Sequence, residues 1–489
     1  MAPAFLKRLV VEAQKTGLCL PALPGWQKRH RRCLASRQRN NRSKSESSGV
    51  SREDAREETT DDSSRIFDEE QGREELAALA TEADASVFVM SYASRQVVWS
   101  LECQLPPQFL FECNTWRPIC PRPPRVWLRR GNAIGLGTKS VFLEVGPAGS
   151  NDCPFAAKVF LISSNVIDID RAFADPDYVD HARALVDKEV HRRMRQEFSI
   201  RRLTTQDDPL TLLSDQGLLV PLCWGIVTDL REDMIRVSPE MVATKFLVIY
   251  PRMACALGEL PFDFLGMSAK LLLTKQCVNV ITKFHANGCV HRDLSLDSFM
   301  LDFEGHVYLR SIRRAARYTG KPEGLVVPED PLYLDPDTAI SLIRQPQGRL
   351  VSMWSRDSWA LGVILFVVWF NRLPYSLPEF AHGDPERKVR SLALLPFIER
   401  PLDDALVVCR SAIPKEVKEL LAGLLRLRGP QRQSPEDISR TSPLFRYVRT
   451  GSDSDHGLPR TTPARSSFPA LDLFLFQRGR ANAVPPGCW

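Results

Sequence analysis

The pattern of apolar and polar positions divides the chain into stretches of different character. Residues 1–84 are mostly charged and polar, with a basic run at 27–44 and an acidic run at 51–64. This composition predicts a largely disordered arm, because it cannot bury enough apolar surface to fold. A short helix is expected only at 69–83. The tail 448–489 is rich in Ser, Pro and Gly and is predicted to be flexible.

Between these ends the pattern changes twice. Residues 85–124 are expected to be an extension that packs on the lobe that follows, and FVMSYASRQVVWSL (88–101) predicts one or two strands. Residues 125–253 alternate strand-like segments with one amphipathic helix at 181–200. Residues 254–447 are mainly helical. A strand-rich segment followed by a helix-rich one predicts an α+β fold of two lobes with a cleft between them.

Composition narrows the classes of function. Hydrophobic residues make up 44% of the chain and charged residues 25%, as in soluble globular proteins, and a net charge of +6 is too small to indicate nucleic-acid binding. The twelve cysteines include no CxxC pair, so no zinc site is expected, and their spacing fits either buried thiols or disulfides. The longest apolar run, 361–370, is too short to span a bilayer. Residues 1–17 lack the apolar core of a signal peptide.

Two features of the first lobe indicate phosphate binding. Gly135 and Gly137 lie between two strand-like runs, where backbone N–H groups can approach phosphate oxygens. Lys158 lies inside the apolar strand FAAKVFL, two residues after Ala156, and a buried ammonium group is costly unless it meets an anion. An ordinary turn and a lysine reaching solvent from an edge strand are the alternatives.

The helix and the strand after Lys158 supply further candidates. Glu189 borders the apolar stripe of the 181–200 helix and is the expected partner of Lys158, with Glu197 as the alternative. The apolar strand FLVIY runs into Pro251 and would lead to the connection between the lobes. Ile249 and Arg252 are therefore expected to line the cleft there.

The strongest motif follows an apolar helix (271–284) that ends at Asn287-Gly288. It reads His291-Arg292-Asp293, and with the preceding parts in this order the stretch 125–447 resembles a eukaryotic protein kinase. The resemblance implies that Asp293 accepts the proton of a substrate hydroxyl and that Ser298 stands at the position of the metal-binding Asn. It also implies that Asp357 braces the backbone of this loop, and that Arg432 pairs with the Asp335-Pro336-Asp337 segment.

A second apparent kinase motif, Asp302-Phe303-Glu304-Gly305, has the wrong spacing. Kinases carry the metal-binding Asp of DFG about 18 residues after the loop Asp, and that count leads from Asp293 to Ser311. The DFEG stretch lies between two strand-like runs, where Asp and Gly are common in turns. We therefore expect a hairpin turn at 302–305 and a degraded metal position at Ser311.

This substitution pattern predicts a weakened enzyme. Mg²⁺ prefers charged oxygen ligands, and both kinase carriers of the metal are serines here, so no metal site is expected and Mg²⁺ binding is doubtful. Lys158 and Asp293 remain, which is compatible with ATP binding. The resemblance thus favours a pseudokinase that acts as a regulatory or scaffold effector. The alternative is a weak or atypical Ser/Thr kinase that transfers phosphate from ATP to protein.

Several segments resemble the rhoptry kinases of apicomplexan parasites, among them FAAKVF, VPLCWGIV, VIYPRM and RDSWALGVILFVVWFNRLPY. That family contains active Ser/Thr kinases and pseudokinases. It implies storage in the rhoptry and secretion into the host cell or the parasitophorous vacuole. An active kinase or a host protein is the expected partner, without nucleic acid. The basic arm offers a contact with membranes as the less favoured alternative to a solvated segment.

Overall fold

A computed structural model describes the chain from residue 68 to residue 445. Gaps in this description fall at 86–91, 116–124, 138, 200–202, 204–207, 231, 320–321, 325–329, 345–348, 352–353, 376–383 and 398–412. The predicted arm up to residue 67 and the predicted tail from residue 448 lie outside the described residues.

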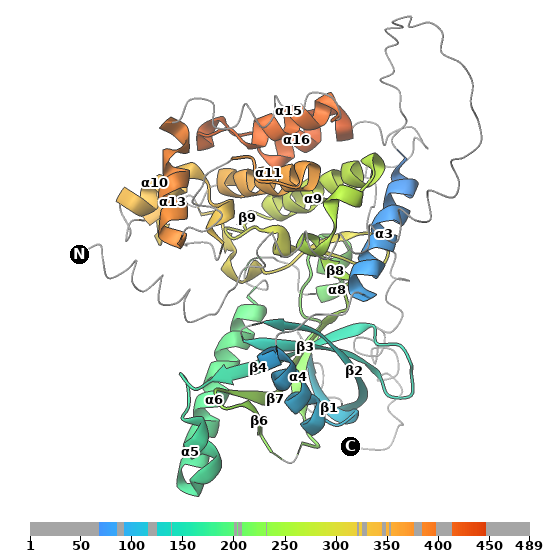
Figure 1. Cartoon of the computed structure of the whole chain (residues 1–489), viewed down its shortest axis with the longest axis vertical. Coiled ribbons are helices and arrows are strands. Elements are labelled where there is room, and N and C mark those ends of the chain that lie inside the picture. The colour runs from blue at the N-terminus through green and yellow to red at the C-terminus, as the bar shows by residue number, and fades with distance from the viewer. Residues whose placement is uncertain are drawn as a thin grey trace, which may run out of the picture. The chain divides into compact units, whose positions relative to one another are not determined.

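Within the described residues, two helices precede the sheet (Figure 1). Helix α3 (Glu69–Ala85) confirms the short helix expected at 69–83. Helix α4 (Tyr92–Gln104) corrects the prediction of strands at 88–101. Its buried side chains Val97, Val98 and Leu101 recur at helical spacing and pack against the strands, whereas Trp99 is 66% exposed. Packing of one helix face therefore outweighed the β propensity of these residues.

Seven antiparallel strands form one sheet in the order β4-β3-β2-β1-β5-β7-β6, and an additional pairing of β4 with β7 closes six of them into a barrel. The strands are β1 (Gln108–Thr115), β2 (Arg125–Gly137), β3 (Ser140–Pro147), β4 (Phe155–Ser163), β5 (Cys223–Val227), β6 (Met234–Ser238) and β7 (Met241–Pro251). Alternate side chains point into the barrel core, among them Val141, Leu143, Ala157 and Val159. Strand β1 belongs to the extension 85–124, so this part of the extension is a strand of the barrel.

Helix α6 (Pro176–Glu197) packs on the outside of the barrel. The apolar stripe predicted from its sequence meets side chains of β4 and β7, such as Phe160 and Val248. Asp175 caps its first turn by accepting a hydrogen bond from the backbone N–H of Asp177, and Pro176 occupies the first helical position. The short helices α5 (Ile169–Ala174) and α8 (Pro209–Ser214) flank it in the chain.

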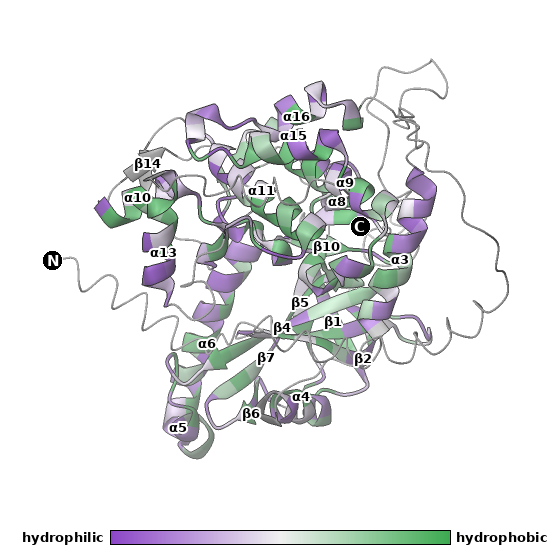
Figure 2. Ribbon diagram, turned by 45° about the horizontal axis from the view of Figure 1, so that its top comes forward, coloured by the Kyte–Doolittle hydropathy of each residue, from purple (hydrophilic) through white to green (hydrophobic). Residues whose placement is uncertain are grey.

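The second half is mainly helical, as predicted. Its core helices are α9 (Met267–Ala286) and α11 (Trp354–Phe370), and Figure 2 shows α11 largely in the colour of apolar residues because its side chains are buried on nearly all sides. No helix of the described ranges is long and apolar enough to cross a membrane. Apart from short 3₁₀ helices, the other elements in the described part of this half are β8 (Cys255–Ala256), β9 (Cys289–Val290), β10 (Phe299–Leu301), β11 (Val307–Leu309), β12 (Ala316–Arg317), β13 (Pro322–Gly324), α10 (Pro336–Arg344), β14 (Arg349–Val351), α13 (Pro385–Leu394), α15 (Lys415–Leu424) and α16 (Pro435–Thr441).

Candidate functional site

Lys158 is placed by strand β4 on the face of the sheet that α6 covers. Its ammonium group forms an ion pair with Glu197 at the end of α6. Tyr250 of β7 donates a hydrogen bond from its hydroxyl to the second carboxylate oxygen of Glu197 at 2.6 Å. The alternative partner considered from the sequence is therefore the one that the structure brings to Lys158.

The group around Glu197 favours its charged form. Burial alone would raise the pKa of Glu197, but Lys158, the Tyr250 hydroxyl and the charge of Arg313 together hold that pKa below its ordinary value. Burial and the adjacent carboxylate raise the pKa of Tyr250 well above its usual range, so its hydroxyl stays protonated and donates. The result is a rigid, hydrogen-bonded Lys158–Glu197 pair.

Glu189 does not face Lys158, which corrects the first choice made from the sequence. Its carboxylate instead accepts hydrogen bonds from Arg192 at 2.6 and 2.7 Å and from Arg193 at 2.8 Å. Arg193 in turn donates to the carbonyls of Leu161 at 2.7 Å and Lys139 at 3.2 Å. Glu189 thus orients an arginine that fastens α6 to β4 and to the turn between β2 and β3.

Replacing Glu189 with glutamine should lower the free energy of unfolding by about 1–2 kcal/mol at neutral pH, because the negative charge facing the two arginines is lost and an amide NH₂ group replaces one of the two acceptor oxygens. The hydrogen bond from Arg192, with that from Arg193, lowers the pKa of Glu189 to about 2 from an ordinary value of 4.5. Its contribution is therefore complete above about pH 4.5 and is lost as the pH falls toward 2. Urea denaturation at pH 7 and pH 3 measures this. The wild-type advantage should shrink at pH 3, and an undiminished advantage would contradict the assignment. Asp187→Asn, an exposed carboxylate on the same helix, is the control.

The glycine positions lie beside Lys158 in the sheet register. Gly135 pairs with Phe142 and Gly137 with Ser140, and Phe142 is opposite Lys158. The Lys158 ammonium nitrogen lies 5.6 Å from the centroid of the Phe142 ring. Ala156 is buried on the same face, since it stands two residues from Lys158 along the strand. A large aromatic ring therefore lies over the predicted phosphate lysine.

Two other predicted cofactor residues lie elsewhere. Ile249 is fully buried inside the barrel core, so the prediction that its side chain lines the cleft is wrong. Its neighbours Val248 and Tyr250 face the Lys158 side of the sheet. Arg252 forms ion pairs with Asp84 and Glu144, each at 2.7 Å. Strand alternation sets which side of β7 a residue faces, and the sequence alone did not fix that register.

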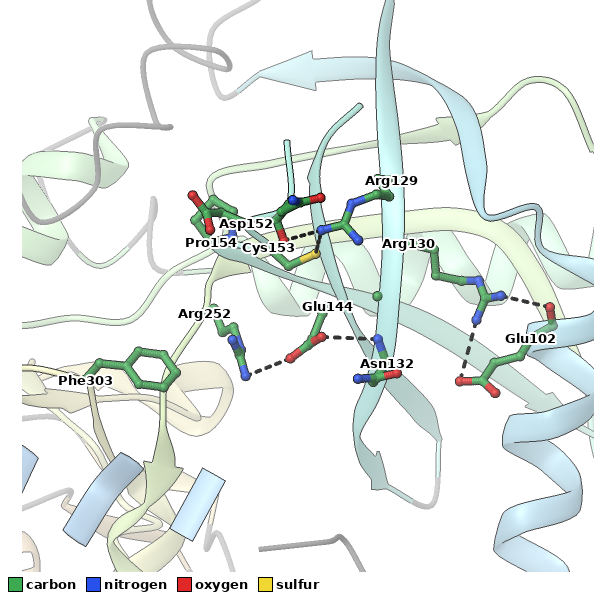
Figure 3. Close-up of a pocket in the computed structure, with 12 residues that line it drawn as sticks. Glu102, Arg129, Arg130, Asn132, Glu144, Asp152, Cys153, Pro154, Arg252 and Phe303 are labelled. Carbon is green, nitrogen blue, oxygen red and sulfur yellow. Dashed lines mark hydrogen bonds and ion pairs between the residues drawn. The ribbon is translucent and has the colours of Figure 1, made fainter. Parts of the chain in front are cut away.

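Arg252 instead borders an open polar pocket of about 830 Å³ (Figure 3). Figure 3 shows its guanidinium group directed at Glu144, and its carbon Cζ lies 5.0 Å from the centroid of the Phe303 ring. Neither Lys158 nor Asp293 lines this pocket. Of the predicted site residues, Arg252 alone lines this pocket.

The His291-Arg292-Asp293 loop is held from below by Asp357 of α11. Its carboxylate accepts hydrogen bonds from the backbone N–H groups of His291 at 2.7 Å and Arg292 at 2.8 Å, and contacts His285 Nε2 at 3.0 Å. Arg292 has a φ of 69°, a conformation that non-glycine residues adopt only under tertiary constraint. The predicted bracing role of Asp357 agrees with these contacts.

Asp293, at the position of the proton-accepting aspartate, is not left open. Its Oδ2 lies 3.2 Å from Nε of Arg314, and the carboxylate side chain is only 12% exposed. Arg314 was not singled out from the sequence. The signal was the double arginine in SIRRAAR, which is unusual directly after a metal-binding position.

The two metal positions carry no carboxylate. Ser298 is buried, and its hydroxyl accepts from the Ser295 N–H at 3.0 Å and lies 3.2 Å from the carbonyl oxygen of Asp293. Ser311 has a φ of 63° and precedes a turn of 3₁₀ helix, Ile312–Arg314. Arg313 lies close enough to Glu197 for its charge to lower the pKa of that carboxyl. A neutral hydroxyl that closes its own loop, and a cation nearby, do not fit Mg²⁺.

The DFEG stretch is the predicted hairpin turn. Strands β10 and β11 pair through Phe299–Leu309, Met300–Tyr308 and Leu301–Val307. Asp302 accepts hydrogen bonds from the backbone N–H groups of Glu304 at 2.9 Å and His306 at 2.8 Å. One oxygen of this carboxylate, Oδ1, therefore closes the turn.

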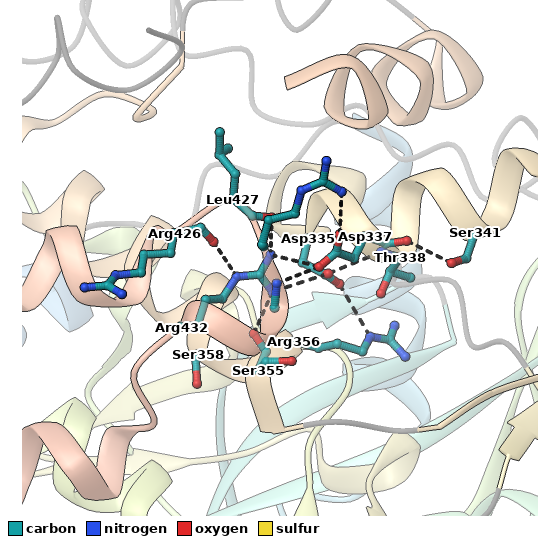
Figure 4. A network of polar contacts seen from close by, with 12 residues as sticks. Asp335, Asp337, Thr338, Ser341, Ser355, Arg356, Ser358, Arg426, Leu427 and Arg432 are labelled. Carbon is teal, nitrogen blue, oxygen red and sulfur yellow. Dashed lines mark hydrogen bonds and ion pairs between the residues drawn. The ribbon is translucent and has the colours of Figure 1, made fainter. Parts of the chain in front are cut away.

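Arg432 reaches the Asp335-Pro336-Asp337 segment, as the resemblance implied (Figure 4). Its Nη1 lies 3.4 Å from Asp335 Oδ1, and its Nη2 lies 3.9 Å from Asp337 Oδ2. Figure 4 shows the guanidinium group between these carboxylates and the carbonyls of Arg426, Leu427 and Ser355. The pair ties α10 to the segment before α16.

Comparisons with known proteins agree with this arrangement. A model of the kinase-like family matches residues 186–432, half of the chain. Serine/threonine-protein kinase ROP17 of Toxoplasma gondii is 27% identical over 184 residues, which are 37% of this chain and 28% of that protein. Rhoptry protein 4 of Toxoplasma gondii is 30% identical over 205 residues, which are 40% of this chain and 32% of that protein. The matches thus span about 30% of the length of these relatives.

Among solved structures, ROP2 of Toxoplasma gondii has a TM-score of 0.56 and 18% identity, with 78% of this chain and 96% of that chain covered. That protein is described as a virulence factor with a protein-kinase fold and no enzymatic activity. The match supports the fold predicted from the sequence. The chain belongs to the kinase-like family, has the bilobal α+β fold of protein kinases, and resembles the rhoptry kinases.

Proposed function

We propose that this chain is a pseudokinase, a kinase-fold protein that acts as a regulatory or scaffold effector without transferring phosphate. The observation that carries this proposal is the ion pair between Asp293 and Arg314. Asp293 is the only acid left among the three positions that kinases use for the base and the metal. The contact with Arg314 occupies Oδ2 of this carboxylate, which in an active kinase would have to meet the hydroxyl of the substrate.

Nucleotide binding is the second part of the proposal. The Lys158–Glu197 pair is the arrangement that kinases use to hold nucleotide phosphates. Arg313 adds positive charge near this pair and offsets phosphate charge where kinases use a metal ion. ATP should therefore bind with little dependence on Mg²⁺.

Partner and location follow from the resemblance to rhoptry kinases. We propose a protein partner, either an active kinase or a host protein, and a route through the rhoptry into the host cell or the parasitophorous vacuole. A weak Ser/Thr kinase is the second candidate function. It is favoured by the Lys158–Glu197 pair and by the braced Asp293 loop, and the relative ROP17 carries the name of a serine/threonine kinase.

A phosphotransfer assay separates these candidates. With Mg²⁺ and labelled ATP, the purified full chain should label itself and a generic protein substrate no more than Asp293→Ala does. Robust labelling that Asp293→Ala abolishes would establish the kinase and overturn the pseudokinase.

A thermal-shift titration tests nucleotide binding independently. ATP should raise the unfolding temperature equally with Mg²⁺ and with EDTA. Lys158→Met should remove the shift, whereas Lys245→Met, a lysine that pairs with Asp233 elsewhere on the sheet, should keep it. A shift that requires Mg²⁺ would contradict the role given to Arg313, and no shift under either condition would remove the nucleotide from the proposal.

A further inference from the structure

Helix α3 packs on the hairpin turn at 302–305, the stretch that resembled a metal-binding motif in the sequence. Gly305 has a φ of 80°, and a Cβ on it would stand 2.8 Å from the carbonyl oxygen of Arg73. A Cβ on Gly72 would stand 2.8 Å from the carbonyl oxygen of Ser268, in α9. Leu76 and Ala80 of α3 are fully buried. The helix backbone therefore lies directly on the hairpin and on α9, with a glycine at each close approach.

A series of three hydrogen-bonded side chains crosses this interface. Arg73 Nη1 of α3 lies 2.6 Å from His306 Nε2 of the hairpin, and His306 Nδ1 lies 3.1 Å from Asp302 Oδ2. A guanidinium group has only donors, so His306 Nε2 must accept. The proton of a neutral imidazole then sits on Nδ1 and is donated to Asp302. Docked α3 is thus compatible only with the neutral form of His306.

This group does not fit a metal ion. Asp302, Glu304 and His306 bring ligand atoms within 4.8 Å of one another. A metal on Nδ1 would leave the proton on Nε2, because a metal-bound histidine donates from its other ring nitrogen. That proton would point at the Arg73 donor. The cluster therefore serves α3 and not a cation.

The charges around His306 come from three elements. The hairpin supplies Asp302 and Glu304, whose Oε2 lies 3.7 Å from His306 Nδ1. Helix α3 supplies Arg73, which also pairs with Glu69 at 3.3 Å. From α9, Lys275 pairs with Glu69 at 3.7 Å, and Gln276 bonds to the backbone of the hairpin. A protonated His306 would keep its bond to Asp302, but its second N–H would meet the Arg73 guanidinium group.

We propose that the contact between Arg73 and His306 is a pH-sensitive latch that holds α3 on the kinase fold while His306 is neutral and loosens it on acidification. Histidine is the residue that changes charge between pH 5 and 8 in proteins. The C-terminal end of α3 connects the latch to the first lobe, since Asp84 forms an ion pair with Arg252, which directly follows β7. Release of α3 would take one of two carboxylates from Arg252 and uncover the surface under Leu76 and Ala80.

Hydrogen exchange of the peptide 69–85 tests the latch in the full chain. After correction for the intrinsic exchange rate, protection of the wild type should fall about tenfold from pH 7.5 to pH 5.0, the size expected for losing one hydrogen bond to a charged group. Arg73→Met should show, at both pH values, the reduced protection that the wild type shows at pH 5.0. Glu75→Met, which loses the bond from the Gly266 N–H but touches no imidazole, should lower protection by the same factor at both pH values.

Unchanged wild-type protection between pH 7.5 and pH 5.0 would overturn the latch, and this comparison needs no variant. A pH dependence that survives in Arg73→Met would also overturn it, since the histidine would then act without its arginine. Gly305→Ala supplies the reference for a displaced helix, because its Cβ would push on the α3 backbone at any pH.

Discussion

Asp357→Ala is expected to lower the free energy of unfolding by about 3–5 kcal/mol, the range for breaking a buried charged network. Asp357 is 1% exposed and serves two backbone N–H groups and one imidazole. Alanine would leave all of these donors buried without an acceptor. It would also release Arg292 from its left-handed conformation, so the loop that carries Asp293 would lose its shape.

Urea denaturation of Asp357→Ala and Asp357→Asn measures this. Asparagine retains one acceptor oxygen, so its loss should be smaller. Asp180→Ala, on an aspartate whose side chain is 90% exposed, is the control and should change stability by less than about 0.5 kcal/mol. A loss for Asp357→Ala as small as that of the control would show that the loop does not depend on this brace.

The same carboxylate predicts a dependence on pH. Burial would raise the pKa of Asp357, but the hydrogen bond and charge of His285 and the neighbouring His291 hold it below its ordinary value. A group with a lowered folded pKa contributes stability above its unfolded pKa, and loses it as the pH falls through the folded value. The difference between wild type and Asp357→Ala should therefore be full above about pH 4 and shrink in stronger acid.

Arg432→Met is expected to cost about 3 kcal/mol, at the lower end of the range for a broken buried ion pair. The Arg432 side chain is 0% exposed, and its removal takes a cation away from Asp335, which is 3% exposed. Arg356 remains 3.7 Å from Asp335, which limits the loss. The ring of Trp359, 5.1 Å from Arg432 Cζ, would keep an apolar contact with methionine.

A double-mutant cycle checks whether the charge is the cause. Arg432→Met leaves the Asp335 carboxylate without this cation, and Asp335→Asn removes that negative charge. The double variant should therefore be more stable, by at least about 1 kcal/mol, than the sum of the two single losses predicts. Additive losses would assign the cost of Arg432→Met to its carbonyl contacts instead. Arg428→Met is the matched control, since this arginine is 52% exposed and lies 3.9 Å from Asp337.

The candidate site was predictable where spacing along the chain decides the role. The distance along the chain from Asp293 to Ser311 excluded the DFEG stretch as the metal position, and the pairing of β10 with β11 confirms that this stretch is a turn. The resemblance to protein kinases identified Asp357 and the pairing of Arg432 with the Asp335-Pro336-Asp337 segment. These features lie on one continuous loop or join motifs with a fixed order, so the linear sequence contains them.

The candidate site was not predictable where a residue's role depends on which face of a helix or strand it occupies, or on which side chain it contacts. Glu189 and Glu197 both lie in α6, and only the packing of that helix brings Glu197 to Lys158. Arg192 and Arg193 pair with Glu189 instead. Ile249 and Tyr250 are neighbours on opposite faces of β7, so a shift of one residue exchanges their environments. Helix α4 was mistaken for strands because its β-branched residues carry a propensity that burial overrides.

The sequence by itself determined the family resemblance, the order of strand-rich and helix-rich parts, and the loss of both metal carboxylates. These depend on residue identity and spacing, which are local. Only the tertiary structure decided that Arg314 binds Asp293, that Glu197 holds Lys158, and that the DFEG turn receives α3 through Arg73 and His306. Those contacts join residues that are far apart in the chain, and packing brings them together.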